Sequence, residues 1–168
     1  MAKCGYCNST ILIGGVKDGE ARFCNQQCQE RGVLMAVSNQ VPPEQVQEAL
    51  RQVHQGLCPR CGGSGPIDVS IAHKVWSALV VTSWKSEPQV CCRSCGRKHQ
   101  AFGLLSSAVV GWWGIPWGLI MTPVQIVRNL AGMFRSYDPY APSPELENMV
   151  RLTIAASLIE QARAEGKA

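Results

Sequence analysis

The sequence has few charged residues for its length. Of its 168 residues, 17% are charged, and the formal net charge is +4. A nucleic-acid-binding domain is usually more basic than this, so the composition does not favour that class. Hydrophobic residues make up 46% of the chain, which argues against wholesale disorder. The length suits one or two small domains and excludes a large multidomain enzyme.

The motifs of common enzymes are also missing. The sequence contains no glycine pattern of the Walker or Rossmann type and no nucleophile elbow. Its 3 histidines lie near no Ser/Asp or Cys/Asn motif that would indicate nucleophilic catalysis. No apolar stretch follows a basic start at the N-terminus, so we expect no secretory signal and a reducing environment. The sequence therefore favours a protein without catalytic activity.

Cysteine is the residue that the chain has in excess. In a reducing compartment, 9 cysteines indicate metal ligands or catalysts before disulfides, and an odd number argues against a fully paired framework. One C-x2-C pair lies near the N-terminus, and a C-x3-C pair follows it. Four thiolates in two close pairs suit tetrahedral Zn²⁺. The expected ligands of this first zinc are Cys4, Cys7, Cys24 and Cys28.

The residues around these four cysteines predict a small finger. Short strands are expected at 10–13 and 21–23, and Asn25 is expected to cap a helix over 26–37. The arrangement resembles treble-clef-like fingers of the TRASH and MYM type, in which a knuckle pair is followed by an aromatic-Cys-x3-Cys pair on a helix. The resemblance covers about residues 3–35 and implies that the four cysteines bind zinc. Such fingers occur in metal-sensing and protein-interaction contexts.

A second set of cysteines repeats the pattern C-x2-C-G. Two such knuckles with strands between them are typical of a zinc ribbon. The strand evidence is the alternation of Ile67, Val69 and Ile71, followed by β-branched and aromatic residues over 75–84. Cys91 is left over. It could replace Cys92 as a ligand, but the repeated C-x2-C-G pattern favours Cys92. The expected ligands of the second zinc are Cys58, Cys61, Cys92 and Cys95.

Other interpretations of the second set are weaker. The run over 58–65 resembles one C-x-x-C-x-G-x-G repeat of J-domain chaperones, but the second pair lacks those glycines and the chain has no His-Pro-Asp signature. A thioredoxin-like redox site needs a helix after its cysteines, which the glycines and proline over 62–66 forbid. His54 lies close to Cys58 in sequence, but the cysteines already complete a set of four ligands.

Between His99 and Arg128 the chain has no charged residue. About 20 residues in a helix span a bilayer, so the length permits a transmembrane segment. Three tryptophans would then lie at its middle, although tryptophan prefers the membrane interface. The alternative is a re-entrant hairpin whose first arm covers 101–113 and which turns at 114–116. Basic residues on both flanks suit a hairpin with both ends on the cytoplasmic side.

An amphipathic helix is expected after this turn. Thr122 and Pro123 indicate its start, with Thr as cap and Pro at the first position. Together with the zinc ribbon, the sequence Gly-Trp-Trp-Gly-Ile-Pro-Trp-Gly over 111–118 resembles a group of uncharacterised bacterial membrane-associated proteins. The resemblance covers about residues 56–134 and implies membrane attachment but no activity. A buried pair of core helices is the soluble alternative. The expected apolar face consists of Val124, Val127, Leu130, Ala131 and Phe134, opposite Gln125, Arg128 and Asn129.

The fold class expected from these patterns is a small α+β protein. Pro43–His54 reads as a linker helix, and Ser143 with Pro144 should start a last helix that carries an apolar stripe. The expected organisation is a treble-clef-like zinc finger over 1–40, a linker helix over 41–57, a zinc ribbon over 58–100, an apolar membrane-associated segment with an amphipathic helix over 101–136, and a proline linker with a C-terminal helix over 137–168.

The sequence thus predicts a non-enzymatic interaction or adaptor protein with two structural Zn²⁺ sites. We expect it to be membrane-associated, by a hairpin or a single span, with its zinc modules on the cytoplasmic side and a protein partner that the sequence does not identify. Self-association stays open. One alternative is a metal-responsive sensor, supported by Cys91 and the N-terminal finger. The other is a nucleic-acid-binding zinc ribbon, which would use Arg60, Lys74, Lys85, Arg93, Arg97 and Lys98.

Overall fold

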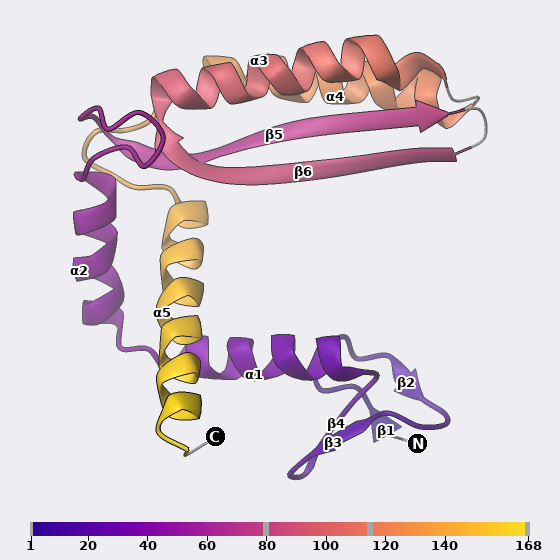
Figure 1. Cartoon of the computed structure of the whole chain (residues 1–168), viewed down its shortest axis with the longest axis vertical. Coiled ribbons are helices and arrows are strands. Elements are labelled where there is room, and N and C mark those ends of the chain that lie inside the picture. The colour runs from indigo at the N-terminus through magenta and orange to yellow at the C-terminus, as the bar shows by residue number, and fades with distance from the viewer. Residues whose placement is uncertain (1, 79–80, 114–115, 167–168) are drawn as a thin grey trace. The chain divides into compact units, whose positions relative to one another are not determined.

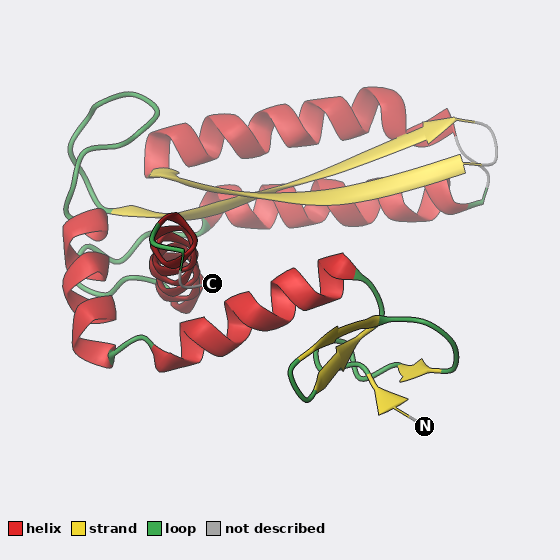
Figure 2. Cartoon of the chain, turned by 60° about the horizontal axis from the view of Figure 1, so that its bottom comes forward, coloured by secondary structure: helices red, strands yellow, loops and turns green. Residues whose placement is uncertain are grey.

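The computed structural model describes residues 2–78, 81–113 and 116–166. Within these ranges the protein is a small mixed α/β structure with five α-helices and three two-stranded sheets (Figures 1 and 2). The chain divides into two compact units. The first consists of Met1–Gln47 and Asn148–Ala168, and the second of Glu48–Glu147.

The first unit begins with two small antiparallel sheets followed by a helix. Asn25 caps the helix as predicted, because its Oδ1 accepts a hydrogen bond of 2.9 Å from the backbone N–H of Cys28. Ile11 and Phe23 are buried beside the first cysteines and form a very small core. The elements are β1 (Ala2–Lys3), β2 (Thr10–Ile11), β3 (Val16–Asp18), β4 (Ala21–Phe23) and α1 (Gln26–Gln40).

Two further helices start in one unit and end in the other. α2 (Pro43–His54) has the predicted bounds, and α5 (Pro144–Ala164) agrees with the predicted C-terminal helix. Ser143 caps α5 as expected, since its Oγ accepts a hydrogen bond of 3.2 Å from the backbone N–H of Leu146. Within the first unit, a second core forms where Val41, Val46 and Ala155 are buried together.

The second unit is built around a long β-hairpin. β5 (Ile67–Ala78) pairs with β6 (Val81–Cys92) from Ile67↔Cys92 to Ala78↔Val81. The helices α3 (Arg93–Val110) and α4 (Trp117–Phe134), with a 3₁₀ turn η1 (Gly111–Trp113) after α3, run alongside β5 on the side away from β6 (Figure 1).

The zinc-ribbon prediction for 58–100 is wrong in its second half. Cys92 ends β6 and Cys95 lies in the first turn of α3, so the second cysteine pair opens a helix and does not form a knuckle. Gly96, the glycine after the second pair, lies in this helix and is buried. A Cβ at Gly96 would lie 2.8 Å from the Tyr137 hydroxyl, so its small size is what the packing requires.

The predicted helix start at Thr122 and Pro123 is also wrong. α4 already begins at Trp117, and Pro123 lies inside it. The sequence signal resembled a capped helix start, but Thr122 is fully buried and faces the packed side of the helix. The predicted hairpin turn at 114–116 falls partly outside the described residues. Among the described helices, none is long and apolar enough to cross a membrane.

Candidate metal centres and an outward-facing apolar surface

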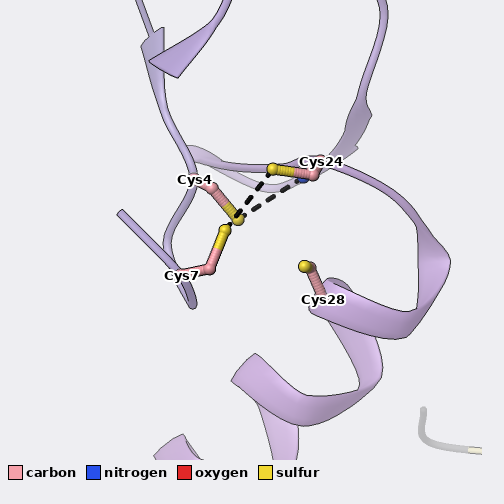
Figure 3. Close-up of side chains that lie close together, drawn as sticks. All are labelled: Cys4, Cys7, Cys24 and Cys28. Carbon is pink, nitrogen blue, oxygen red and sulfur yellow. Dashed lines mark hydrogen bonds between the residues drawn. The ribbon is translucent and has the colours of Figure 1, made fainter. Parts of the chain in front are cut away.

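The first four cysteines converge at the N-terminus of α1. All four sulfurs lie within 4.8 Å of one another, and the Sγ atoms of Cys7 and Cys24 are 3.5 Å apart. Cys4 and Cys7 come from the turn after β1, Cys24 follows β4, and Cys28 lies in the first turn of α1. The sulfurs point toward a common centre (Figure 3).

The backbone of the first pair is held as a tight knuckle. Cys4 donates its N–H to the carbonyl of Ser9 at 2.9 Å, and Asn8 donates to the carbonyl of Cys4 at 3.0 Å. Asn8 adopts a φ of 57°, a left-handed conformation that asparagine tolerates better than most residues. The backbone N–H of Cys24 approaches the Cys4 sulfur at 3.4 Å and ties the knuckle to the second pair.

The second four cysteines repeat this hydrogen-bond pattern. Cys58 donates to the carbonyl of Gly63 at 2.9 Å, and Gly62 donates to the carbonyl of Cys58 at 2.8 Å. Gly62 takes the left-handed conformation, with a φ of 68°, that Asn8 takes in the first knuckle. The backbone N–H of Cys92 approaches the Cys58 sulfur at 3.3 Å. The N–H of Cys24 approaches the Cys4 sulfur in the same way, at 3.4 Å.

Both centres therefore share one plan: a knuckle, a β-hairpin and the N-terminus of a helix. The second set of sulfurs also lies within 4.8 Å, with 3.7 Å between Cys61 and Cys92. The shared C-x2-C-G motif hid this plan, because it made the second pair look like another knuckle. A signal against the knuckle was present in the sequence, since no proline and only one further glycine follow Gly96 before Gly111.

Cys91 stays outside the second centre. Successive side chains of a strand point to opposite faces, so Cys91 and Cys92 cannot both face the other three sulfurs. The Cys91 side chain is buried in the small core with Ile67. Burial raises the pKa of its thiol to about 11, which keeps it protonated at neutral pH.

His54 also lies outside the cysteine cluster. Its ring is buried, and Nδ1 lies 2.8 Å from the carbonyl oxygen of Ile67. This contact holds the end of α2 against the start of β5. The structure thus gives His54 a packing role beside the second centre.

The thiols of the first centre have opposed pKa shifts. The backbone N–H of Cys7 is the main cause that lowers the pKa of Cys4 to about 6. The neighbouring sulfurs of Cys7 and Cys4 raise the pKa of Cys24 to about 12. Four sulfurs this close cannot all be ionised unless a cation balances them, so the thiols share protons between them.

The second centre shows the same opposition. Burial works against ionisation of Cys58, but the backbone N–H groups led by that of Cys92 outweigh it and hold its pKa at about 6. The sulfur of Cys61 and burial raise the pKa of Cys95 to about 12. A divalent cation would replace the shared protons in both centres.

The sulfur positions fit a tetrahedral metal ion. A Zn–S bond of about 2.3 Å in tetrahedral geometry separates the sulfurs by about 3.8 Å. The closest sulfur pairs, at 3.5 and 3.7 Å, are near that separation. All 9 cysteines are free thiols. Each centre can therefore hold one metal ion.

A different kind of surface lies on the helices of the second unit. The helices α3 and α4 and the turn η1 between them expose large apolar side chains; Trp113 of η1, for example, is 71% exposed. We call this set the outer apolar surface. It consists of Phe102, Leu105, Val109, Trp112, Trp113, Trp117, Ile120, Val124, Val127, Leu130 and Phe134.

The inward sides of the same helices carry polar and small residues. Asn129 is fully buried, accepts a hydrogen bond of 2.8 Å from the backbone N–H of His73, and donates to the His73 carbonyl. Ser107 accepts from the N–H of Val75 at 3.1 Å, and Gln100 donates to the carbonyl of Ile71 at 3.5 Å. These side chains occupy the edge of β5 that β6 leaves open, and so satisfy its backbone.

Glycines let these elements approach closely. A Cβ at Gly111 would lie 2.3 Å from Thr122 Oγ1, and one at Gly118 would lie 2.6 Å from the carbonyl of Gly111. Such distances leave no room for a larger side chain.

The predicted apolar face of 124–134 is exposed. Of the predicted polar face, Gln125 and Asn129 are buried, whereas Arg128 is exposed beside the apolar residues. The sequence did not indicate that the uncharged polar residues are the buried ones.

Comparisons with known proteins add no identity. No family model matches the chain, and neither a curated protein nor a solved structure matches it.

Proposed function

We propose that this protein is a non-enzymatic interaction protein, associated with a membrane and stabilised by two structural Zn²⁺ ions. The observation that carries the proposal is the distribution of side chains on α3 and α4: the residues that these helices bury are uncharged polar residues and glycines, whereas most of their large apolar side chains are exposed. A surface helix of a water-soluble domain has the opposite distribution. The metal centres supply the rigid parts that such a protein presents to a partner.

The donor sets support zinc and a structural role. Four thiolates in tetrahedral geometry select Zn²⁺ or an iron–sulfur centre. With four protein ligands, a zinc ion has no open position for a water or a substrate. The small size of the core around Ile11 and Phe23 supports a folding role, because so few buried residues do not hold a segment of this length without a metal.

The outer apolar surface supports the proposed membrane association. Burying a large apolar side chain yields about 1.5–3 kcal/mol relative to leaving it in water, so this surface is strongly stabilised by a lipid environment. All 5 tryptophans lie in the second unit and are at least 44% exposed, which suits a membrane interface. Because none of the helices in the described ranges is long and apolar enough to cross a bilayer, we propose that α3 and α4 enter one leaflet or lie at its surface.

The charges around this surface support a cytoplasmic orientation. No acidic residue lies between Glu87 and Asp138, while five arginine and lysine residues do. Basic residues are attracted to the anionic lipids of a cytoplasmic leaflet. The zinc modules would then lie on the cytoplasmic side, where thiols remain reduced. Those five residues are Arg93, Arg97, Lys98, Arg128 and Arg135.

The first unit carries a candidate binding site for a protein partner. Leu12 and Ile13 follow β2, and the Ile13 side chain is 96% exposed. Two adjacent exposed aliphatic residues beside a metal centre make a small apolar contact site. We propose that a cytoplasmic protein binds there.

Membrane association is tested by flotation of the full-length, zinc-loaded protein with vesicles of mixed neutral and anionic phospholipid. The double variant I120E/V127E places two carboxylates on the outer apolar surface. We expect it to reduce vesicle binding about tenfold or more, because a charged group is expelled from hydrocarbon. The matched control L12E/I13E makes the same changes on the first unit and should float like the unchanged protein.

The proposal would be overturned by a chain that stays monomeric without detergent and does not float with any vesicle. A soluble chain that binds nucleic acid with a steep salt dependence would favour the nucleic-acid alternative instead. The structure weakens that alternative, because Lys74 and Lys85 both pair with Glu87, at 2.5 and 3.6 Å.

A further inference from the structure

A hollow of about 360 Å³ lies in the second unit, beside its metal centre. The cysteine knuckle, the strand β6 and the first half of α3 each contribute to its wall. None of its lining residues is acidic, and three carry basic nitrogen atoms. The lining residues are Arg60, Gln89, Cys95, Lys98, His99 and Phe102.

The basic groups of the hollow are available to a ligand. Within the described part of the chain, neither Arg60 nor Lys98 forms an ion pair. The nearby carboxylate of Glu87 is already engaged by Lys74 and Lys85. The hollow therefore carries positive charge that the surrounding described side chains do not neutralise.

His99 adds a polar atom without a hydrogen-bond partner. Its Nδ1 is buried, and no described residue donates to it or accepts from it. Burial is the main cause that lowers the pKa of the ring; the charges of Lys74 and Arg60 act in the same direction and that of Glu87 opposes them. An oxygen atom seated against the ring would supply the missing partner, which is worth more at a buried site than at an exposed one.

The hollow also borders the outer apolar surface. Phe102 belongs to both, and its side chain is 62% exposed. Lys74 Nζ lies 5.5 Å from the centre of the Phe102 ring, which places one more cation at this border. A ligand with an anionic group and an apolar chain could place the former in the hollow and the latter along α3.

We propose that the hollow binds the phosphate group of a phosphate ester, supplied at the membrane by the headgroup of an anionic phospholipid. Arg60 and Lys98 provide the charge, since guanidinium and ammonium groups are the usual partners of phosphate oxygens. The hydrogen bonds of Gln89 and His99 would orient the group. The phosphate site stands on the hollow alone, whereas the lipid source rests on the proposed membrane association.

The site is tested first with glycerol 3-phosphate and the full-length, zinc-loaded protein. Binding is followed by the NMR signals of the His99 ring. We expect saturable shifts that R60Q/K98Q abolishes and that the charge-conserving R60K/K98R retains. The control R128Q/R135Q removes the same charge from α4 and the residue after it, outside the hollow, and should leave the shifts unchanged. Zinc content is measured for each variant, so that a damaged knuckle is recognised.

The lipid source is tested with vesicles. Neutral phosphatidylcholine vesicles are compared with vesicles that also contain phosphatidic acid. We expect tighter binding to the second kind, and a loss in R60Q/K98Q that exceeds the roughly thirtyfold that the general attraction of two basic groups, about 1 kcal/mol each, accounts for. The control R128Q/R135Q should lose less, because it removes only the general attraction.

The outcomes separate the two proposals. Saturable shifts without any vesicle binding would support the hollow as a site for a soluble phosphate ester and overturn the membrane proposal. Vesicle binding that R60Q/K98Q and R128Q/R135Q weaken equally, with no shift of His99, would overturn the hollow and leave the membrane proposal standing.

Discussion

Asn129 illustrates how single polar residues hold the second unit together. It is fully buried on α4, and its side-chain oxygen and nitrogen both form hydrogen bonds with the backbone of His73 on β5. A buried backbone N–H or carbonyl left without a partner costs about 1–3 kcal/mol. One side chain therefore bonds two strand groups, the His73 N–H and the His73 carbonyl, which also accepts a longer hydrogen bond of 3.4 Å from Ser107 Oγ.

Replacing this amide tests its importance directly. We expect N129L to lower the free energy of unfolding by about 1–3 kcal/mol, because the His73 N–H loses its partner and the His73 carbonyl keeps only its longer hydrogen bond from Ser107. The measurement is urea unfolding of the zinc-loaded chain in mild detergent. The control N148L makes the same change at an exposed position of α5 and should alter stability by less than about 0.5 kcal/mol. A loss as small as that in N129L would show that water or a rearranged side chain replaces the amide.

At the scale of elements, the two metal centres are one design used twice. Each places a knuckle before a hairpin and a second cysteine pair at the start of a helix. In each, a backbone N–H from the second pair approaches the first sulfur of the knuckle, at 3.4 and 3.3 Å. The hairpins differ greatly in length, from three to twelve residues per strand, so the centres tolerate very different insertions.

Replacing a cysteine of either metal centre should lower the zinc content, whereas replacing Cys91 should not. We expect the unchanged chain to hold two zinc ions and C28S to hold one, because a serine cannot replace the thiolate. C91A should still hold two, since the Cys91 thiol faces a core and not the metal centre. Zinc is measured by elemental analysis of freshly purified protein. Two retained ions in C28S, or one lost in C91A, would contradict the assignment of the ligands.

On the scale of the whole molecule, the chain forms two units whose stability has different sources. The first has only a few buried residues around its cysteines, whereas the second has a hairpin covered by two helices. The first should therefore depend more on its metal ion. The segments α2 and α5 belong to both units, so the chain crosses between them twice.

Hydrogen exchange of the full-length protein tests this division. In C28S we expect amides over 2–40 to exchange at rates close to those of an unfolded chain, while those of β5 and β6 keep their protection. In C95S the protection of β5 and β6 should fall instead. If C28S removed protection from β5 and β6 as well, the two units would unfold as one cooperative structure.

Local patterns in the sequence were sufficient for the first finger and for several helices. Asn25 and Ser143 predict helix starts because a side-chain oxygen can accept from the first free backbone N–H groups, and both do so. The four-residue spacing of Cys24 and Cys28 predicts a ligand in the first turn of a helix. The bounds of α2 also followed from its apolar spacing and its proline start.

Where a short motif allowed two structures, the motif by itself could not choose between them. The motif around Cys92 and Cys95 is compatible with a knuckle or with a helix start, and packing of Gly96 against Ser70 and Tyr137 selects the helix. Thr122 and Pro123 look like a helix start, but the contact of this segment with Gly111 keeps them inside α4.

The sequence alone determined that eight thiols would come in two sets of four and that the 124–134 helix would have one apolar and one polar face, because both depend on spacing along the chain. Only the tertiary structure decided which face is buried. The open edge of β5 needs hydrogen-bond partners, and the polar residues of α3 and α4 supply them, so the large apolar residues are left on the outside.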